Sequence, residues 1–225
     1  EELEQVCRLL ADEQSRKVFA SVLNYKISGK ISYLADCTTP VREAYENLLR
    51  LNGQEDYVDL GAYKGDTIQE FLTYSGGSCR SITAFEPDEK NYKKLVAKMA
   101  ELGLAADCYN LSAHNRQEVL RFASRGGRHS SLDKEKGRLV AANSLDAVLQ
   151  GRRVSFINMD VEGAEKEALE GCRESIRLHR PKLLVSIYHR TQDMFAIPLQ
   201  LRELCPGYRF YMRHYQYIPA WDTNI

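Results

Sequence analysis

Acidic residues and glycines follow an apolar segment of the sequence in an arrangement that can hold a cofactor. The segment ends in Asp59, Gly61 and Gly65, and a helical pattern begins at Thr67. Glycine lets a ligand approach the backbone because it has no Cβ atom, and the first turn of a helix has N–H groups free to bind that ligand. Neither G-x-G-x-x-G nor G-x-x-x-x-G-K-[ST] occurs, which argues against a dinucleotide or phosphate site. The spacing suits a zwitterionic ligand whose ammonium group needs a carboxylate, such as S-adenosylmethionine (SAM).

Further polar residues lie where the next strands are expected to end. Glu86, between Phe85 and Pro87, can accept hydrogen bonds from both ribose hydroxyls of a nucleoside, although taken alone it would more often belong to a helix N-terminus. Asn110 and Ser112 can meet an adenine edge or form only a turn. We predict a set of cofactor-binding residues: Asp59, Gly61, Ala62, Tyr63, Gly65, Asp66, Thr67, Glu86, Pro87, Asn110, Ser112 and Asp160.

Two carboxylates and two histidines are candidates for the chemistry itself. Asp160 and Glu162 follow a later apolar segment, where a carboxylate can stabilise a sulfonium or orient a substrate hydroxyl. Glu165 is expected to interact with the dipole of the helix that follows. His189 and His214 are candidate general bases because the ordinary pKa of histidine suits that role at neutral pH, and each also fits a structural role. A divalent metal could bind Asp160, Glu162 and a histidine, but no spacing supports this, so no metal ligand is assigned.

Alternating strand and helix patterns must position these residues. Strands are predicted over Asp56 to Leu60, Ser81 to Phe85, Ala106 to Asn110, Val154 to Met159, Leu183 to Tyr188 and Tyr208 to Tyr211. Helices are predicted over Thr67 to Tyr74, Asp88 to Leu102, Ser144 to Leu149 and Gly163 to Leu178, and from Thr191 to an interruption at Pro198. An inserted hairpin is predicted from Val119 to Ala123 and from Arg138 to Ala142. This order predicts a mainly parallel sheet with helices on both faces.

The first 53 residues are predicted to form a helical N-terminal extension ahead of a domain over residues 54–225. Asp12 is placed to cap a helix that ends at Gly29. A second helix is expected to start at Thr39-Pro40 and to stop at Gly53.

The composition narrows the class of protein. The chain has 225 residues, with 31 basic and 31 acidic side chains, so no basic field attracts nucleic acid or an anionic membrane. Its six cysteines form no C-x-x-C pair, which favours reduced thiols in a cytoplasmic protein. No apolar run approaches the length of a membrane span.

The sequence resembles the FkbM family of SAM-dependent methyltransferases from about residue 55 to its end. The matching motifs are Asp59-Leu-Gly-Ala-Tyr-Lys-Gly-Asp-Thr67, Phe85-Glu-Pro87, Ser144-Leu-Asp146 and, most specifically, Met159-Asp-Val-Glu-Gly-Ala-Glu165. The resemblance implies a class I, Rossmann-like methyltransferase fold with a seven-stranded sheet. It also implies O-methylation of hydroxyls on sugars or polyketide-like metabolites, with S-adenosylhomocysteine as the product. Two features depart from the family: Asn158 replaces a common Lys, and the last strand is truncated if the fold ends at Ile225.

We therefore expect a SAM-dependent methyltransferase that acts on a small-molecule or glycan acceptor, without a nucleic-acid or membrane partner. No oligomeric state is predicted. A nucleic-acid methyltransferase is one alternative, against which the balanced charge and the lack of an Asn/Asp-Pro-Pro-Tyr/Phe motif argue. A SAM-binding protein without turnover is another, and Asp160 and Glu162 argue against it.

Overall fold

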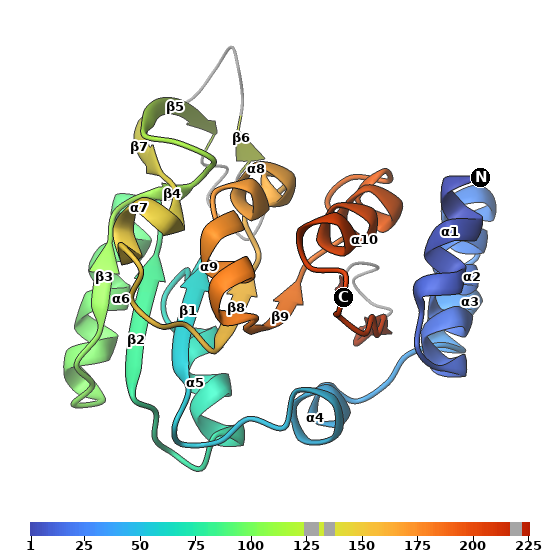
Figure 1. Cartoon of the computed structure of the whole chain (residues 1–225), viewed down its shortest axis with the longest axis horizontal. Coiled ribbons are helices and arrows are strands. Elements are labelled where there is room, and N and C mark those ends of the chain that lie inside the picture. The colour runs from blue at the N-terminus through green and yellow to red at the C-terminus, as the bar shows by residue number, and fades with distance from the viewer. Residues whose placement is uncertain (124–130, 133–137, 217–221) are drawn as a thin grey trace. The chain divides into compact units, whose positions relative to one another are not determined.

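The chain forms two compact units in the computed structural model, which describes residues 1–123, 131–132, 138–216 and 222–225 (Figure 1). The sheet unit contains Leu51–Leu184, and the terminal unit contains Glu1–Arg50 together with Val185–Ile225. The predicted boundary at residue 53 lies near the border between the units, whereas residues 185–225 fold with the N-terminal helices. None of the described helices is both long enough and apolar enough to cross a lipid bilayer.

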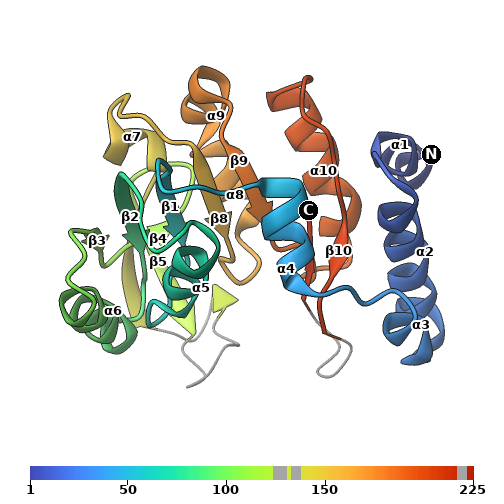
Figure 2. The ribbon, with the colours of Figure 1, turned by 90° about the horizontal axis from the view of Figure 1, so that it is seen from below.

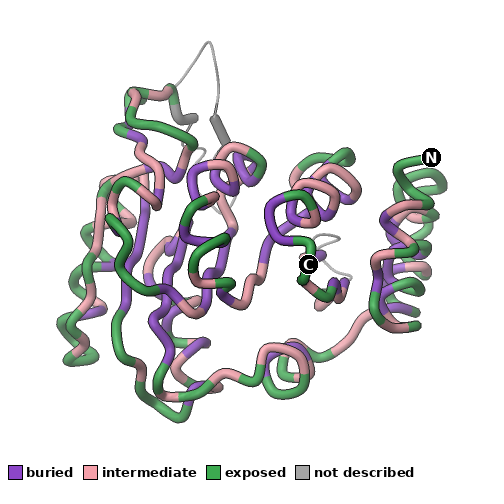
Figure 3. Tube along the Cα trace, in the orientation of Figure 1, coloured by how far each residue is buried: buried purple, intermediate pink, exposed green. Residues whose placement is uncertain are grey.

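A largely parallel sheet forms the centre of the sheet unit, with the strand order β3-β2-β1-β8-β9. Its strands are β1 (Asp56–Leu60), β2 (Ser81–Phe85), β3 (Asp107–Tyr109), β8 (Phe156–Met159) and β9 (Lys182–Val185). β1, β2, β3 and β8 pair in parallel, and β1 and β8 are buried along their whole length, as expected for apolar strands covered on both faces (Figure 3). The predicted α/β class is confirmed. The predicted count of seven strands is not confirmed, because this sheet has five strands among the described residues.

Helices lie on both faces of this sheet. Figure 2 shows α5 (Asp66–Tyr74) and α6 (Glu89–Glu101) on one side, and α7 (Leu145–Leu149) and α9 (Arg173–His179) on the other. The rings of Tyr57 on β1 and Phe71 on α5 stack with their centroids 4.2 Å apart, and Phe156 on β8 lies 5.1 Å from Tyr57. This aromatic stack anchors α5, which begins at the candidate site, to the centre of the sheet.

The helix predicted from Gly163 to Leu178 is wrong as a single element, because α8 (Glu165–Glu170) precedes a separate α9. The break includes Gly171, where an added Cβ atom would lie 2.0 Å from the carbonyl oxygen of His114. Asp146, on α7, then caps α9 by accepting two N–H bonds from its first turn, at 2.8 Å and 2.9 Å. Helical periodicity alone does not reveal a cap supplied by another helix.

A second sheet in this unit contains the inserted hairpin. Its strand order is β4-β7-β5-β6, with β4 (Ser112–Ala113), β5 (Glu118–Ala123), β6 (Ser131–Leu132) and β7 (Arg138–Asn143). β5 pairs with β7 in antiparallel register, so the predicted hairpin is confirmed.

The terminal unit combines helices from the start of the chain with the last elements. These are α1 (Glu2–Leu9), α2 (Glu13–Ser28), α3 (Ser32–Ala35), α4 (Val41–Glu43), the π-helix η1 (Ala44–Leu49), α10 (Asp193–Leu204), β10 (Arg213–His214) and β11 (Thr223–Asn224). Asp12 caps α2 through the N–H of Ser15 at 2.7 Å, and Gly29 ends α2 with a φ of 70°, as predicted. The second helix ends at Arg50, not at Gly53, because Arg50 itself adopts the left-handed conformation with a φ of 49°.

Two predictions for the last part of the chain are wrong. The strand predicted over Tyr208 to Tyr211 lies two residues beyond that range, as β10, whose residues 213 and 214 pair with β11. Phe210, within the predicted range, makes only an isolated bridge to Leu10. α10 continues through Pro198 and is not interrupted there. The proline removes one backbone hydrogen bond, but its own ring and several neighbouring apolar side chains of α10 are buried, which offsets that loss.

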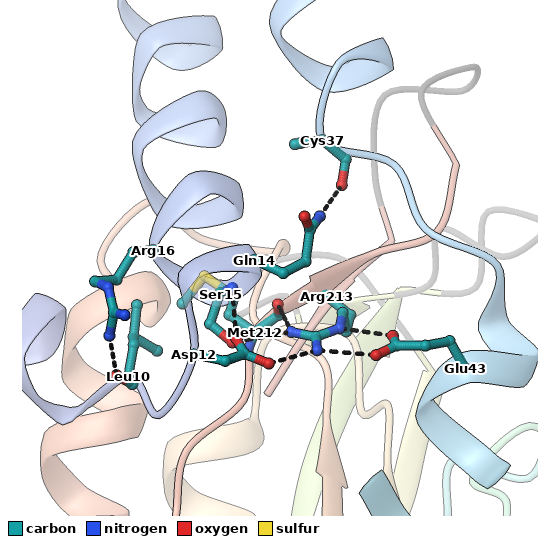
Figure 4. A network of polar contacts seen from close by, with 9 residues as sticks. All are labelled: Leu10, Asp12, Gln14, Ser15, Arg16, Cys37, Glu43, Met212 and Arg213. Atoms are coloured by element: carbon teal, nitrogen blue, oxygen red, sulfur yellow. Dashed lines mark hydrogen bonds and ion pairs between the residues drawn. The ribbon is translucent and has the colours of Figure 1, made fainter. Parts of the chain in front are cut away.

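A buried arginine joins both ends of the chain within the terminal unit (Figure 4). The side chain of Arg213 is 4% exposed, and its guanidinium lies 2.7 Å from Asp12 and 2.7 Å from Glu43. It also donates a hydrogen bond of 2.9 Å to Ser15 Oγ. Burial acts to raise the pKa of Asp12, but hydrogen bonds from Arg213 and Ser15 outweigh it and lower that pKa to about 2. The network therefore fixes β10 to α2 and α4.

Candidate functional site

The loop after β1 enters the left-handed region of backbone conformation at three residues. The φ angles of Gly61, Tyr63 and Gly65 are 95°, 49° and 86°. A Cβ atom on Gly61 would lie 2.0 Å from the carbonyl oxygen of Asp160, and one on Gly65 would lie 3.0 Å from Met99 Cε. The space beside both glycines is thus filled by protein atoms. This corrects the sequence interpretation: the two glycines allow the loop to pack against its neighbours and do not simply leave room for a ligand.

Asp59 lies near the end of β1 and is fully buried. Its carboxylate accepts a hydrogen bond of 2.5 Å from Thr67 Oγ1 and one of 3.1 Å from Asn158 Nδ2. Burial raises the pKa of Asp59 to about 6, and these two bonds oppose the shift. Asp59 therefore joins the first turn of α5 to β8. The bond from Asn158 to Asp59 was not predicted, although Asn158 stands only two residues before Asp160.

Glu86 connects the end of β2 with the loop after β1. It is 5% exposed, and its carboxylate accepts N–H bonds from Tyr63 at 2.9 Å and from Asp88 at 2.8 Å. Burial raises the pKa of Glu86 to about 7, and the two backbone bonds act against that rise. Asn110 donates to the carbonyl oxygens of Glu86 and Pro87 at 2.8 Å and 3.0 Å, which fixes the chain on both sides of the carboxylate.

The loop after β8 carries the two candidate catalytic carboxylates. The N–H of Asp160 bonds to the last carbonyl of β1 at 2.9 Å, and Glu162 has a φ of 58°. Glu165 is 1% exposed, and its Oε1 atom accepts N–H bonds from Val161 at 3.1 Å and from Gly163 at 3.2 Å. Beyond the expected helix-dipole interaction, Glu165 therefore holds the backbone of this loop. Its place in the first turn of a helix gave no sign of that.

The other predicted cofactor residues in the sheet unit have varied positions. Ala62 is buried and donates its N–H to Phe85 at 2.9 Å. Asp66 is exposed at the start of α5, and Ser112 is buried in β4. The structure thus brings the loops after β1, β2 and β8 into direct contact, and it places Ser112 in the sheet that contains the hairpin.

Both candidate histidines belong to the terminal unit, so their part in catalysis stays a prediction. His214 is 1% exposed, with Nδ1 2.9 Å from Thr223 Oγ1. Burial lowers the pKa of His214 to about 4, which makes it a weak base at neutral pH. His189 is partly buried, and its ring centroid lies 4.0 Å from that of Tyr188. His189 is therefore the better candidate for a general base.

The arrangement in the sheet unit can bind a polar, partly cationic ligand. Ligands of parallel α/β sheets bind outside the carboxyl ends of the strands, which is where these three loops meet. Carboxylates can accept hydrogen bonds from hydroxyl groups there and can stabilise positive charge.

Comparison with known proteins identifies one family and a set of solved structures with a similar fold. A family model described as the methyltransferase FkbM domain matches residues 59–219, well over half of the chain. The search of curated proteins found no match.

Two of the solved structures that match this chain illustrate the shared fold. The crystal structure of methyltransferase FkbM from Methylobacillus flagellatus KT has 24% sequence identity and a TM-score of 0.84 over 99% of this chain. The chain spans 57% of the length of that protein. Aeropyrum pernix fibrillarin, in complex with natively bound S-adenosyl-L-methionine, has 11% identity and a TM-score of 0.54, covering 82% of this chain and 70% of its own.

Proposed function

Because the chain belongs to the FkbM methyltransferase family, we propose that it transfers the methyl group of SAM to a hydroxyl group of a sugar, a glycan or another small metabolite. The observation that carries this proposal is the contact among three strand-end loops. The Glu86 carboxylate bonds to the loop after β1, and the Asp160 carbonyl packs against Gly61 in the same loop. Fibrillarin, whose crystal structure contains SAM, supports the choice of cofactor through its shared fold.

The residues of the sheet unit fit a nucleoside with a cationic tail. Glu86 is a buried carboxylate whose known partners are backbone N–H groups, and as an anion it can accept further hydrogen bonds from ribose hydroxyls. Asp59 holds the start of α5 through Thr67 and adds negative charge beside that first turn. In this proposal Glu86 holds the ribose, and the loop after β1 surrounds the amino-acid part of SAM.

In this proposal Asp160 and Glu162 take part in the methyl-transfer step itself. SAM supplies an electrophilic methyl group on its sulfonium when it is bound. Asp160 and Glu162, on a loop held by backbone bonds, orient the acceptor hydroxyl and stabilise positive charge. We propose His189 as the group that takes the proton from the acceptor hydroxyl. Residues outside these loops would choose the acceptor.

A methyl-transfer assay tests this function. The protein is incubated with radiolabelled SAM and with fractionated glycans, lipids and small metabolites, in the presence and absence of a chelator. We expect label in a hydroxyl-bearing fraction. Asp160→Ala should lower the labelling by roughly 100-fold or more and leave SAM binding measurable, because a positioned electrostatic group acts mainly on the transition state.

The matched control is Glu101→Ala, which removes an exposed carboxylate from the end of α6 and should keep full activity. Full turnover by Asp160→Ala would refute the role of Asp160. Tight SAM binding without label in any fraction would favour the non-catalytic alternative. Labelled RNA with a steep salt dependence would favour the nucleic-acid alternative.

The affinity for SAM should rise with pH between about 6 and 7.5. The raised pKa of Glu86, about 7, means that the free protein carries a proton there at pH 6. Acceptance of ribose hydroxyl bonds by both oxygens requires the anion, so binding must release that proton, and Kd should fall by up to about tenfold per pH unit below the pKa. Calorimetry at several pH values measures this slope.

Glu86→Gln is the control for that pH dependence, because an amide keeps the shape of the carboxyl group and does not titrate. We expect weaker binding by Glu86→Gln with little change between pH 6 and 7.5. The same slope in wild type and Glu86→Gln would show that another group is responsible. Asp59, with a pKa of about 6, would then be the next candidate.

A further inference from the structure

We propose that Glu165 is a positioning residue that holds the Asp160 loop, residues 160–163, in the conformation needed for methyl transfer. This inference rests on the proposed function, because it assigns a purpose to the shape of that loop. Glu165 itself is buried and is the first residue of α8. Its effect on the reaction would pass through the backbone that carries Asp160 and Glu162.

The Asp160 loop has a conformation that its residues do not prefer. Glu162 has a φ of 58°, in the left-handed region that is unfavourable for residues with a side chain, and Gly163 follows with a φ of 94°. Such a conformation persists only where its surroundings determine it. The loop therefore needs contacts that hold the peptide groups on both sides of Glu162.

Glu165 provides those contacts. Its Oε1 atom accepts the N–H of Val161 at 3.1 Å and the N–H of Gly163 at 3.2 Å, so the bonds flank Glu162 in the sequence. Burial of Glu165 protects both bonds from competing water. One carboxylate oxygen thus closes the loop around the left-handed residue.

The other side of the loop is fixed by β1. The N–H of Asp160 bonds to Leu60 at 2.9 Å, and its carbonyl oxygen occupies the space that a Cβ atom on Gly61 would take. The loop is therefore held between β1 and Glu165. Movement on the Glu165 side would shift the candidate catalytic carboxylates and leave the contact between Glu86 and Tyr63 in place.

Two variants of Glu165 separate its role as a hydrogen-bond acceptor from a role of its charge. Because both N–H bonds end on Oε1, Glu165→Gln can keep both with its single carbonyl oxygen. Glu165→Met fills a similar volume and accepts neither bond. A Glu165 that acted through its charge, as a base or an ion ligand, would lose its function in Glu165→Gln as well.

Amide hydrogen exchange measured by NMR tests the positioning role directly. We expect Glu165→Met to raise the exchange rates of the Val161 and Gly163 amides by tenfold or more, and Glu165→Gln to change them by less than about threefold. Unchanged exchange in Glu165→Met would overturn the proposal, as would equal loss of protection in both variants. If Glu165→Met does not fold, exchange in the wild-type protein is the test. Unprotected Val161 and Gly163 amides in wild type would also overturn the proposal.

Turnover separates this inference from the proposed function. With an acceptor fraction that wild type labels, Glu165→Met should lose tenfold or more in kcat with a SAM Kd within about threefold of wild type, and Glu165→Gln should recover most of the kcat. Loss of turnover in Glu165→Gln equal to that in Glu165→Met would overturn the positioning role. If wild type labels no fraction, the proposed function fails, while the exchange experiment still decides the role of Glu165.

Discussion

Gly61→Ala should abolish measurable SAM binding and lower the free energy of unfolding by about 3 kcal/mol or more. The added Cβ atom would lie 2.0 Å from the carbonyl oxygen of Asp160 and 2.9 Å from its carbonyl carbon. Both are backbone atoms, so no side-chain rotation relieves the collision, and overpacking of this kind costs about 1 to 3 kcal/mol. The φ of 95° adds about 1 to 2 kcal/mol for any residue with a Cβ atom. The loops after β1 and β8 must therefore separate.

Gly76→Ala separates these two causes. Gly76 has a φ of 80°, but a Cβ atom there would meet no heavy atom within 4 Å. This variant should lose only about 1 kcal/mol and bind SAM as wild type does. Urea denaturation and calorimetry on both variants provide the comparison. Equal losses of stability in Gly61→Ala and Gly76→Ala would show that the packing of Asp160 against Gly61 does not shape the site. Normal SAM binding by Gly61→Ala would show the same.

Arg213→Met should lower the free energy of unfolding by about 3 kcal/mol or more, because it leaves two carboxylates without their buried cation. The side chains of Asp12 and Glu43 are 33% and 30% exposed, so water can partly solvate their charges once the arginine is removed. We therefore expect a loss of unfolding free energy at the lower end of the usual range of about 3 to 5 kcal/mol. Methionine fills the volume of the arginine stem, so the loss reports on charge and hydrogen bonds more than on packing.

Arg42→Met is the control for the loss of an arginine. Arg42 pairs with Glu46 at 3.6 Å, but the two side chains are 72% and 54% exposed, so the change should cost less than about 1 kcal/mol. Similar losses of unfolding free energy in Arg213→Met and Arg42→Met would contradict the proposed importance of the buried Arg213 network.

The pH dependence gives a second test of the same network. The pKa of Asp12 is depressed to about 2, so its contribution to stability is present above its ordinary value of 3.8 and is lost as the pH falls through about 2. The difference in stability between wild type and Arg213→Met should therefore narrow below pH 4. A difference that stays constant down to pH 2.5 would argue against the pairing of Asp12 with Arg213.

The ends of β1, β2 and β8 lie where the sequence predicted them, because polar residues follow each of these apolar segments. Asp59 is the last residue but one of β1, and Glu86 and Asp160 come directly after β2 and β8, so the parallel pairing of these strands brings all three to one edge of the sheet. The α/β class followed from the same alternation of strands and helices. The cap at Asp12 was also predictable, because Asp12 and the Ser15 N–H that it accepts lie three positions apart in the sequence.

Contacts between distant residues were not predictable from spacing. Asn158 donates to Asp59 across 99 positions of sequence, and the fit of the Asp160 carbonyl against Gly61 depends on how two loops fold back on each other. Glu165 was visible as an acidic residue in a first helical turn, yet its bonds to Val161 and Gly163 require the left-handed turn at Glu162, which no periodicity reports.

Isothermal titration calorimetry with SAM and S-adenosylhomocysteine tests the central claim most directly, because every proposed role in the sheet unit depends on this cofactor. The account predicts that folded wild-type protein binds both ligands at one site per chain, and that Glu86→Gln weakens both. Absence of binding by folded protein to either ligand, at pH 7.5 where Glu86 is mostly ionised, would contradict the account.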